Sequence, residues 1–522
     1  MFLNDLLGRQ KAEDQSWKLP CSTESICPEC LKVLGAELRE EDGKVFMYKE
    51  CDEHGAYNEL ISSDAEFFKK MRRTHYERPV SLENPQTVSK DGCPNDCGIC
   101  NNHLSTPGMI NIDLTNRCNL NCPICFANAN ASGKLFELAP EQLEKMLDDV
   151  ANFKPVTASC VQFAGGEPTV YPHFFEAIKM ASDRKFSQIQ VASNGLKFAR
   201  SFEFCEKAAE AGLEEIYLQF DGMSDDIYKQ SRGRPLYETK MQAIENIKRA
   251  GMRIALVPTI VRGLNDHQLG DILKFAIENI DVISAISWQP VAITGRIDEE
   301  KRREMRFTTA DLARCIQEQT GIMDMYRDWY PFSIVAPIVR LLEAVTKSSH
   351  LHVSCHPHCG CASYLLVDKE TNTAYPFPEF MDIESAMEAL NKEAKRIEKH
   401  PWLKNYSLLQ SMNAMKKYFY NEKIGKDWKF EDLMNFITGF MEDNKYSSTK
   451  EYMENLKSKR YGILFSASMH FQDGYNYELD RTRHCVVWYG APDGRFYPFC
   501  TYNSGPCHRY TVEEAYSRPL NE

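Results

Sequence analysis

Short apolar runs alternate with amphipathic stretches between about residues 108 and 305 of the chain. Runs rich in β-branched and aromatic residues predict strands, and apolar positions that recur every three to four residues predict helices. The predicted strands are residues 109–115, 159–165, 188–193, 215–221, 253–261 and 285–291. Helical patterns, such as residues 140–153 and 236–251, lie between them. This alternation is typical of βα units on a parallel sheet, and six units suit a partial (βα)6 barrel that is open on one side.

The pattern changes on both sides of this barrel segment, residues 108–305, and divides the chain into four parts. Residues 1–80 predict a small metal-binding domain of the rubredoxin or zinc-knuckle kind, and residues 81–107 a linker that carries cysteines. Residues 306–522 predict several helices and then strands, an α+β domain that binds a further cluster. The fold class is therefore α/β: a partial barrel with a metal-binding domain before it and a cluster-binding domain after it.

Composition narrows the class of protein. Apolar residues make up 43% and charged residues 26% of the 522 residues, as in ordinary globular proteins. The net charge of −12 argues against a nucleic-acid partner held by a basic face. The 19 cysteines fall in tight groups, which favours metal sites over disulfides. The N-terminus does not resemble a signal peptide, and there is no apolar run of about 18 residues, so we expect a cytoplasmic protein.

Cys118, Cys122 and Cys125 follow the first barrel strand in the spacing C-x3-C-x2-C. Three thiolates this close can hold three irons of a [4Fe–4S] cluster and leave the fourth iron open to a substrate or cofactor. A cluster with four cysteine ligands mainly transfers electrons. The triplet alone also fits a zinc knuckle or a ferredoxin loop, so the surrounding motifs have to decide between these sites.

Polar and glycine-rich loops follow the second to fifth predicted strands. The carboxyl ends of parallel strands meet at one face of a barrel, so these loops should gather near the cysteine triplet. Each loop on its own fits a plain turn. Their order after consecutive strands predicts a cofactor site instead, with candidate residues Gly165, Gly166, Glu167, Pro168, Ser193, Asn194, Gln219, Asp221, Thr259 and Arg262.

The N-terminal domain carries a mononuclear metal candidate. Cys27, Cys30, Cys51 and His54 would make a tetrahedral site of three thiolates and one imidazole. Cys21 could replace His54 and give four thiolates, as in a rubredoxin-like iron site. The pattern does not separate iron from zinc.

Two further cysteine groups predict auxiliary clusters. Cys93, Cys97 and Cys100 repeat the C-x3-C-x2-C spacing just before the barrel, and their fourth ligand would come from elsewhere in the chain. An APDG turn between Cys485 and Cys500 predicts a hairpin that brings these two thiols together. The C-terminal group can supply another [4Fe–4S] site from Cys355, Cys359, Cys361, Cys485, Cys500 and Cys507.

The cysteine loop with its flanks resembles the cluster loop of radical S-adenosylmethionine (SAM) enzymes. The full order of motifs, from about Cys27 to Arg509, resembles the archaeal tetraether lipid synthase group of these enzymes. The resemblance implies a SAM cluster on the central triplet, two auxiliary [4Fe–4S] clusters and a mononuclear iron. It also implies that the loop at Glu167 binds the methionine amino group of SAM, and that the other strand-end loops contact its carboxylate and ribose.

This resemblance implies a reaction in which a 5′-deoxyadenosyl radical abstracts hydrogen from the terminal methyl carbons of archaeal diether lipids. Two lipid chains would then be coupled by a carbon–carbon bond. The expected partners are an archaeal phospholipid or other long-chain lipid and an external electron donor such as ferredoxin or flavodoxin. We also expect peripheral contact with a membrane, through the apolar stretch at residues 329–345. The C-terminal cysteine group is expected to hold the cluster nearest the substrate.

Three other functions compete with the lipid synthase function. A radical SAM enzyme that methylates or otherwise modifies a pterin-type small molecule would share all the central loops, and a short polar pocket would favour it over lipid tunnels. A peptide-modifying enzyme would carry a CxxCxxxxxC core near its C-terminus, which this chain lacks. A plain iron–sulfur electron carrier would not explain the GGEPT loop and the barrel order.

Overall fold

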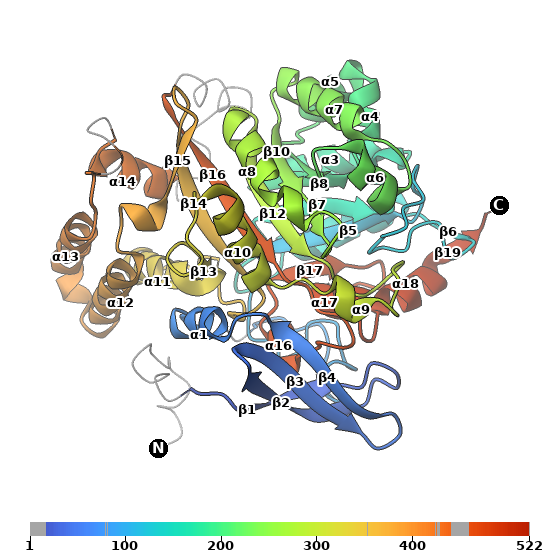
Figure 1. Ribbon diagram of the computed structural model, residues 1–522, viewed down its shortest axis with the longest axis horizontal. Helices are drawn as coiled ribbons and strands as arrows, with labels where there is room; N and C mark the ends of the chain where they lie inside the picture. The colour runs from blue at the N-terminus through green and yellow to red at the C-terminus, as the bar shows by residue number, and fades with distance from the viewer. Residues whose placement is uncertain are drawn as a thin grey trace.

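The computed structural model describes residues 17–520, apart from residues 79, 81, 352, 423, 425–427 and 440–458. Its N-terminal part is an antiparallel meander of β1 (Cys21–Ile26), β2 (Val33–Glu41), β3 (Lys44–Cys51) and β4 (Gly55–Ser62). Helix α1 (Ala65–Arg73) follows, and its first turn is capped by the Asp64 side chain, which accepts from the N–H of Phe67. In Figure 1 this small sheet lies at the bottom of the molecule, below α1 and α16.

The centre of the molecule is one large mixed sheet. Six neighbouring strands in it are parallel to one another and follow the chain in order. They are β5 (Met109–Thr115), β7 (Cys160–Gly165), β8 (Gln188–Ser193), β9 (Glu215–Gln219), β10 (Arg253–Val257) and β12 (Ile283–Pro290). The predicted fifth strand is split, because the short β11 (Thr259–Ile260) leaves β10 and pairs with β12 alone. The predicted α/β fold with a parallel barrel sheet and an N-terminal metal domain is confirmed.

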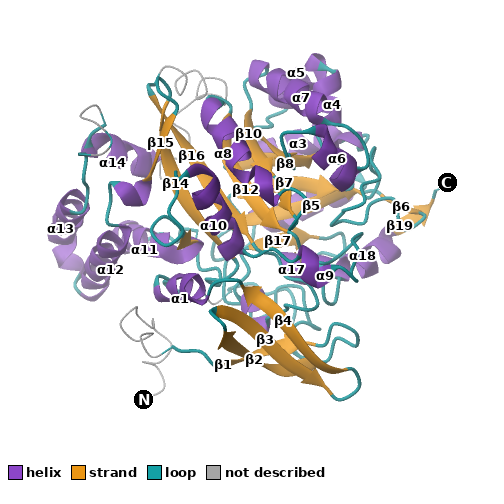
Figure 2. Ribbon diagram, in the orientation of Figure 1, coloured by secondary structure: helices purple, strands orange, loops and turns teal. Residues whose placement is uncertain are grey.

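Helices cover the outer face of these strands (Figure 2), and the reason lies in the alternation of side chains along each strand. Ile112, Phe163, Val191, Leu218 and Leu256 all point into the main apolar core with the helices. The covering helices are α2 (Pro140–Ala151), α3 (Phe174–Asp183), α4 (Leu196–Arg200), α5 (Phe202–Glu210), α6 (Asp225–Arg232), α7 (Tyr237–Arg249) and α8 (Leu269–Glu278).

The C-terminal part of the chain extends both edges of the barrel sheet. On one edge, β16 (Tyr461–Met469) pairs in parallel with β12 and antiparallel with β14 (Gly360–Asp368). On the other edge, β17 (Val487–Gly490) pairs in parallel with β5 and forms a hairpin with β18 (Phe496–Pro498), as the APDG turn predicts. The remaining short strands are β6 (Lys134–Phe136), β13 (Tyr330–Pro331), β15 (Thr373–Pro376) and β19 (Ser517–Pro519).

Further helices surround these edges. They are α9 (Arg302–Met305), α10 (Thr309–Thr320), α11 (Ala336–Thr346), α12 (Ile383–Lys399), α13 (Lys404–Lys417), α14 (Phe430–Gly439), α16 (Leu479–Arg483), α17 (Phe499–Asn503) and α18 (His508–Tyr516). Among the helices of the described residues, none combines the length and apolar content that a membrane crossing needs.

The apolar stretch at residues 329–345 packs against other parts of the protein. Trp329 has none of its surface exposed, and Lys70 of α1 donates to its backbone oxygen (2.6 Å). The helix in this stretch begins only at Ala336 and carries Arg340, which pairs with Glu398 of α12. The apolar character of this stretch therefore reflects packing within the protein.

Candidate active site

The loop that follows β5 carries Cys118, Cys122 and Cys125. The pKa of the Cys118 thiol is raised to about 12, first by burial and then by the charges of Glu167, Cys122 and Cys125. The three thiols therefore lie together, beside the carboxylate of Glu167. Apolar side chains pack against Cys118 and Cys122, namely Leu120, Leu196, Tyr228 and Leu236. This donor set, with its apolar wall, fits a [4Fe–4S] cluster that has one open iron.

Arg296, just after β12, holds the cysteine loop in place and is not among the residues predicted from the sequence. Its guanidinium donates to the backbone oxygens of Cys122 (2.9 Å) and Ala129 (2.6 Å). Gly295 approaches so closely that a Cβ there would lie 2.4 Å from the backbone oxygen of Cys125. The sequence could have indicated these residues, because they lie in the loop after the sixth predicted strand. This loop corresponds to the loops after strands two to five, from which the other candidates were taken.

Gly165, the last residue of β7, and Gly166 bring the next loop against the cysteine loop. The N–H of Gly166 donates to the backbone oxygen of Thr115 (2.7 Å), and the N–H of Glu167 to that of Arg117 (2.8 Å). A Cβ on Gly165 would lie 2.3 Å from the oxygen of Thr115, and one on Gly166 would lie 2.3 Å from that of Arg117. The close approach that these glycines allow is therefore to the protein's own backbone.

Glu167 is buried and joins the loops that follow β7 and β8. Its carboxylate accepts from the Ser193 hydroxyl (2.8 Å) and from the backbone N–H of Asn194 (2.8 Å). The Asn194 side chain in turn donates to Oδ1 of Asn119 in the cysteine loop (2.7 Å). Pro168, next to Glu167, begins a short 3-10 turn (η2, Pro168–Val170).

Asp221, just after β9, is paired with Arg232 of α6, which the sequence pattern does not single out. Arg232 Nε and Nη2 lie 2.5 and 2.9 Å from the two carboxylate oxygens of Asp221. Arg232 also donates to the backbone oxygen of Ile124 in the cysteine loop (2.9 Å) and to Oγ1 of Thr259 (3.2 Å). One guanidinium therefore connects the loops after β9 and β10 to the cysteine loop.

Gln219 joins this group through Lys240 of α7, a lysine with none of its surface exposed. Lys240 Nζ donates to Gln219 Oε1 (2.8 Å) and to the backbone oxygen of Asn194 (2.6 Å), while Gln219 Nε2 donates to Asp221 (2.6 Å). Burial lowers the pKa of Lys240 to about 7, against the opposing charge of Asp221. Lys240 is a third residue of the site that sequence reasoning missed, after Arg296 and Arg232, since it is only one polar position among many in its helix.

Arg262 is the one predicted strand-end residue that the structure places elsewhere. It donates to the backbone oxygen of Arg306 (2.9 Å) and pairs with Asp311 of α10 (2.9 Å). Its guanidinium also lies over the ring of Phe307. The chain turns after β11, so Arg262 faces the α9–α10 segment, while its near neighbour Thr259 reaches the network of Arg232.

The N-terminal metal candidates do come together. Ligand atoms of Cys27, Cys30, Cys51 and His54 all lie within 4.8 Å of one another, so His54 completes the group and Cys21 does not. The sulfurs of Cys30 and Cys51 are 3.7 Å apart, and the sulfur of Cys51 is 3.5 Å from Nδ1 of His54. These spacings match the edges of a tetrahedron with zinc–sulfur bonds of about 2.3 Å.

Cys93, Cys97 and Cys100 form a second group in the linker. The thiols of Cys93 and Cys97 interact directly, and both this contact and the charge of Cys100 raise the pKa of the buried Cys97 thiol. The charges of Cys97 and Cys500 both act on the pKa of buried Tyr477, which burial raises first. The linker triplet therefore lies close to the C-terminal cysteine group.

Four cysteines of the C-terminal segment face one another. Burial raises the pKa of Cys355 well above its usual range, and the charges of Cys359 and Cys485 add to this effect. The pKa of Cys485 is raised in the same way by burial and then by the charges of Cys500 and Cys359. These four thiols suit a [4Fe–4S] cluster with a full set of cysteine ligands.

Cys361 and Cys507 stand outside this group. Cys361 on β14 packs in the main apolar core, and the charge of Lys70 is the one that acts on its thiol. Cys507 precedes α18, where its thiol donates to the backbone oxygen of Asn503 (3.4 Å). Cys361 lies within β14, which begins at Gly360, whereas Cys359 is still in the loop before this strand, so the two side chains are placed by different elements.

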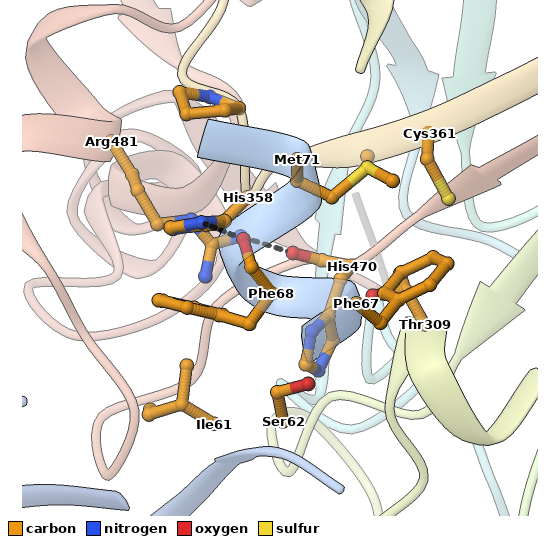
Figure 3. A pocket seen from close by; sticks show the side chains of 12 residues that line it. Ile61, Ser62, Phe67, Phe68, Met71, Thr309, His358, Cys361, His470 and Arg481 are labelled. Atoms are coloured by element: carbon orange, nitrogen blue, oxygen red, sulfur yellow. Dashed lines mark hydrogen bonds between the residues drawn. The ribbon is translucent and has the colours of Figure 1, made fainter. Parts of the chain in front are cut away.

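A small pocket lies beside the four-cysteine group, between α1 and β14 (Figure 3). Arg481 enters it and donates to the backbone oxygen of His470. Burial lowers the pKa of Arg481, but the charges of Cys359 and Cys500 outweigh this effect and raise it. The pocket is lined by Ile61, Ser62, Phe67, Phe68, Met71, Thr309, Pro357, His358, Gly360, Cys361, His470 and Arg481. Arg481 is thus a buried cation next to thiolates that a cluster would leave with net negative charge.

A group of two histidines and one glutamate in this region has the spacing of a metal site, but nearby positive charges disfavour a metal ion there. His356, His358 and Glu478 offer ligand atoms within 4.8 Å of one another. Burial lowers the pKa of His358 well below its usual range, and the charges of Arg72 and Arg481 lower it further. Two nearby guanidinium groups disfavour a cation at this point.

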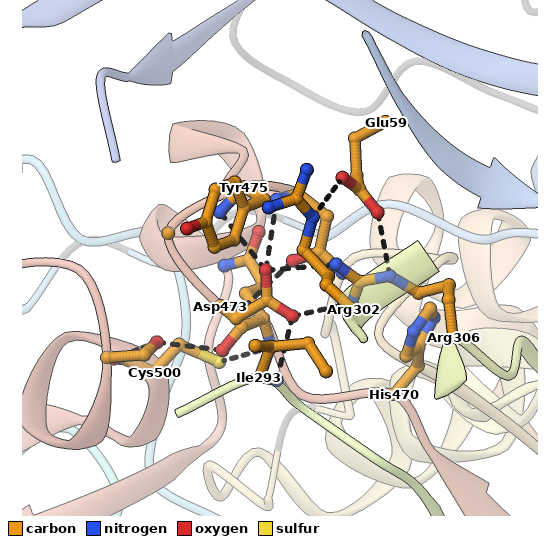
Figure 4. Close-up of polar contacts among 12 residues, drawn as sticks. Glu59, Ile293, Arg302, Arg306, His470, Asp473, Tyr475 and Cys500 are labelled. Atoms are coloured by element: carbon orange, nitrogen blue, oxygen red, sulfur yellow. Dashed lines mark hydrogen bonds and ion pairs between the residues drawn. The ribbon is translucent and has the colours of Figure 1, made fainter. Parts of the chain in front are cut away.

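A buried ion-pair network ties the N-terminal sheet to the barrel and to the segment before α16 (Figure 4). Arg306 donates to Glu59 of β4 (2.9 Å) and to Asp473 (2.5 Å), and Asp473 also accepts from the N–H of Ile293 after β12 (3.0 Å). The neighbouring residue Gln472 donates its N–H to the sulfur of Cys500 (3.4 Å). The four-cysteine group is therefore positioned partly through Arg306.

Aromatic rings lie between the cysteine loop and the four-cysteine group. Phe126 follows Cys125 directly, and its ring centre is 5.4 Å from that of Phe499, which precedes Cys500. Phe471 stacks on Phe499 with ring centres 3.9 Å apart. These rings connect the surroundings of the two cysteine groups.

The inner face of the barrel strands is polar. Many of the residues that alternate with the outward apolar ones carry amide, carboxylate or hydroxyl groups, and several of these groups bond to one another between strands. Gln162 Nε2 donates to Asn111 Oδ1 (2.7 Å), and Gln289 Nε2 donates to the Tyr217 hydroxyl (2.9 Å). The polar inward residues are Asn111, Asp113, Gln162, Gln190, Glu215, Tyr217, Gln219, Ser284, Ser287 and Gln289.

Comparison with known proteins agrees with this geometry. The family model of the radical SAM superfamily matches residues 112–276, and that of the HMPTM N-terminal zinc ribbon domain matches residues 19–63. The chain is 40% identical to the 7,8-dihydro-6-hydroxymethylpterin dimethyltransferase of Methanocaldococcus jannaschii, over 96% of both chains. The chain belongs to the radical SAM superfamily, in the family of this relative. Its cofactors are therefore SAM and a [4Fe–4S] cluster, accompanied by auxiliary metal sites and an N-terminal zinc ribbon.

More distant radical SAM proteins share parts of the chain. The GTP 3′,8-cyclase of Pseudomonas fluorescens is 22% identical over 343 residues, which cover 63% of this chain and 95% of the cyclase. Among solved structures, SuiB of Streptococcus suis bound to S-adenosylmethionine is 19% identical, covering 42% of this chain and 48% of SuiB with a TM-score of 0.34.

The comparisons correct the expected substrate. The relative that spans 96% of the chain is named for a pterin, so the predicted archaeal phospholipid or other long-chain lipid partner is wrong. The resemblance to tetraether lipid synthases is likewise unsupported, as is the peripheral membrane contact that depended on it. The physical reason is that the cysteine and strand-end motifs describe how SAM and clusters are held, and these sites are shared by enzymes with unrelated substrates.

Proposed function

We propose that this radical SAM enzyme methylates a pterin-type small molecule inside the barrel. The observation that carries the proposal is the polar inner face of the barrel strands. A lipid chain would leave the unpartnered side-chain oxygens of Asp113, Gln162 and Gln190 on this face without a donor, at a cost in free energy for each group. A pterin carries ring nitrogens, an oxygen and an amino group that can bond to them.

The residues of the site take separate roles in this proposal. A reduced cluster held by Cys118, Cys122 and Cys125 would supply, with SAM, a radical able to abstract hydrogen from an unactivated carbon. Glu167, with Gly165, Gly166 and Pro168 in its loop, orients the amino end of SAM. Lys240 holds the loop after β8 through Asn194, and Arg232 holds the loop after β9 through Asp221. Ser193, Gln219 and Thr259 complete this frame, which keeps SAM at the barrel mouth.

The auxiliary sites have different positions relative to the barrel mouth. We assign Cys355, Cys359, Cys485 and Cys500 to the auxiliary cluster nearest the substrate, because Phe499 beside Cys500 contacts Phe126 beside Cys125. The Cys93, Cys97 and Cys100 group would hold a second auxiliary cluster behind it. The N-terminal site of Cys27, Cys30, Cys51 and His54 is structural in this assignment.

An anaerobic assay with SAM and a strong chemical reductant tests the function. Cluster-reconstituted protein would be given a 7,8-dihydro-6-hydroxymethylpterin in one reaction and an archaeal diether lipid in another. We expect 5′-deoxyadenosine formation to rise with the pterin, and the recovered pterin to gain the mass of one or more methyl groups. Deoxyadenosine formation that ignores the pterin and responds to the lipid would overturn the proposal.

A further inference from the structure

A single level of polar side chains crosses four neighbouring barrel strands. In the strand register, Asn111 pairs with Gln162, Gln162 with Gln190, and Gln190 with Glu215. Partners in parallel register point to the same face, so these four side chains form one row across the inner face. Gln162 is three residues before the glycine loop, which places the row about 10 Å below the barrel mouth.

The orientation of the Gln162 amide is decided by its neighbours. The Asn111 NH2 group donates to the backbone oxygen of Trp488 (3.4 Å), which can only accept. The side-chain oxygen of Asn111 therefore faces Gln162 and takes a hydrogen bond from its NH2 group (2.7 Å). The Oε1 atom of Gln162 is left without a hydrogen-bond partner, on a side chain that is only 6% exposed.

The Gln190 amide is oriented in the same way from the other end of the row. Glu215 accepts from the Gln190 NH2 group (2.6 Å) and also from Gln188 (2.8 Å) and the Ser284 hydroxyl (2.5 Å). A carboxylate cannot donate, so Gln190 must direct its NH2 group to Glu215. Its Oε1 atom is also without a partner, on a side chain that is 5% exposed.

The row therefore presents two neighbouring acceptors, the Oε1 atoms of Gln162 and Gln190. Asp113, one level closer to the mouth, adds a third acceptor, since its Oδ1 atom has no partner while Oδ2 pairs with Arg509. Buried acceptors without donors are rare in proteins and indicate a missing partner. Two residues after Gln162 and Gln190, on the same strands, stand the small side chains of Ala164 and Ala192. Tyr217 lies at this level in the register and reaches Ser287 and Gln289 of β12.

We infer that Gln162 and Gln190 recognise the N–H edge of a 2-aminopyrimidinone ring, through hydrogen bonds from its exocyclic amino group and its adjacent ring N–H. This inference rests on the proposed function, because a pterin carries this edge. The flat ring lies at the level of the alanines, and the opposite end of the pterin faces the cysteine loop. Gln162 and Gln190 are thus specificity-determining residues, and they take no part in SAM cleavage.

A substrate analogue tests the inference without altering the protein. In a 2-oxo analogue of the pterin, an oxygen replaces the amino group and meets an acceptor of the row. We expect the wild-type enzyme to lose roughly 100-fold or more in kcat/KM with this analogue, since a site built to bond an N–H rejects a ligand that lacks it. Equal use of the two compounds would overturn the inference while leaving the pterin function intact.

Substitutions of Gln162 and Gln190 provide a second test of the inference. Gln162→Met and Gln190→Met keep side-chain length and remove the acceptor, so we expect KM for the pterin to rise roughly 10-fold or more with SAM cleavage in the absence of pterin unchanged. The ratio of kcat/KM for the pterin to kcat/KM for the 2-oxo analogue should fall to a few-fold in both variants. Gln188→Met is the matched control, because Gln188 also donates to Glu215 but lies one level below the row, where it pairs in register with Cys160.

Different results would contradict the proposed function and the recognition of the pterin by Gln162 and Gln190. If wild-type protein shows no pterin-dependent deoxyadenosine at all, the proposed function is wrong. If wild type responds to the pterin but the two variants keep its KM and its discrimination, the recognition row is wrong. If Gln188→Met matches the other two variants in every readout, the row is structural and the inference is likewise wrong.

Discussion

The ammonium nitrogen of Lys240 lies 2.6 Å from the backbone oxygen of Asn194, so helix α7 is tied directly to the loop after β8. The same nitrogen donates to Gln219 at the end of β9. Two strand-end loops are therefore held at a fixed spacing by one buried side chain. Glu167 and Asp221, which we assign to the SAM frame, are each bonded to one of these loops.

Lys240→Met should weaken SAM binding and leave the clusters in place. Methionine fills similar volume but cannot donate to Asn194 or Gln219, so the two loops lose their common anchor. We expect the Kd for SAM to rise roughly 10-fold, since each charge-assisted hydrogen bond contributes about 1.5–3 kcal/mol. Anaerobic equilibrium dialysis and iron analysis measure the two effects. Lys229→Met on the exposed face of α6 is the control, and an unchanged Kd in Lys240→Met would remove the anchor role.

Arg296→Lys should reduce occupancy of the central cluster. A lysine cannot place two donors on the backbone oxygens of Cys122 and Ala129 together, so the cysteine loop becomes less ordered. Changes outside the direct ligands of a metal site typically cost roughly 10- to 100-fold in metal affinity. Iron and sulfide content after reconstitution at limiting iron checks this expectation. Arg303→Lys, an exposed residue of α9, should retain the wild-type content, and equal content in both variants would contradict the prediction.

Asp473→Asn should destabilise the whole protein. It leaves Arg306 buried with a single acidic partner, Glu59, and breaking a buried pair costs about 3–5 kcal/mol. Unfolding followed by denaturant titration under anaerobic conditions gives the free energy. Asp298→Asn breaks an exposed pair with Lys301 and should change it by less than about 1 kcal/mol. A similarly small change in Asp473→Asn would show that the network is not needed for stability.

Glu214→Gln should make the protein relatively more stable as the pH rises. Burial raises the pKa of Glu214 from 4.5 to about 7, with Arg253 acting in the opposite direction. The folded state therefore binds this proton more tightly than the unfolded state, and the wild type loses stability as pH rises through about 7. Glutamine removes that loss, by about 1–3 kcal/mol above pH 7. Thermal unfolding at about pH 5.5 and about pH 8 measures it, with exposed Glu210→Gln as control; a pH-independent difference would contradict the assignment.

The pattern of apolar runs was sufficient to predict the parallel barrel, because strand and helix periodicity is a local property of neighbouring residues. The spacing of Cys118, Cys122 and Cys125 was equally local, and so was that of Cys27 and Cys30. These motifs identified a radical SAM enzyme and its metal-binding segments. They could not identify the substrate, because the side chains that would meet it are spread singly over strands whose inner and outer faces must first be assigned.

Only the tertiary structure placed Arg232, Lys240 and Arg296 at the cysteine loop and turned Arg262 away from it. It also gathered Cys355, Cys359, Cys485 and Cys500 into one group without Cys361 and Cys507. The row formed by Gln162 and Gln190 depends on strand register, which pairs residues far apart in the chain. Short-range preferences of the sequence thus determined the elements and the cysteine motifs, whereas packing between distant segments decided which polar groups meet, because a contact between remote residues leaves no regular spacing in the sequence.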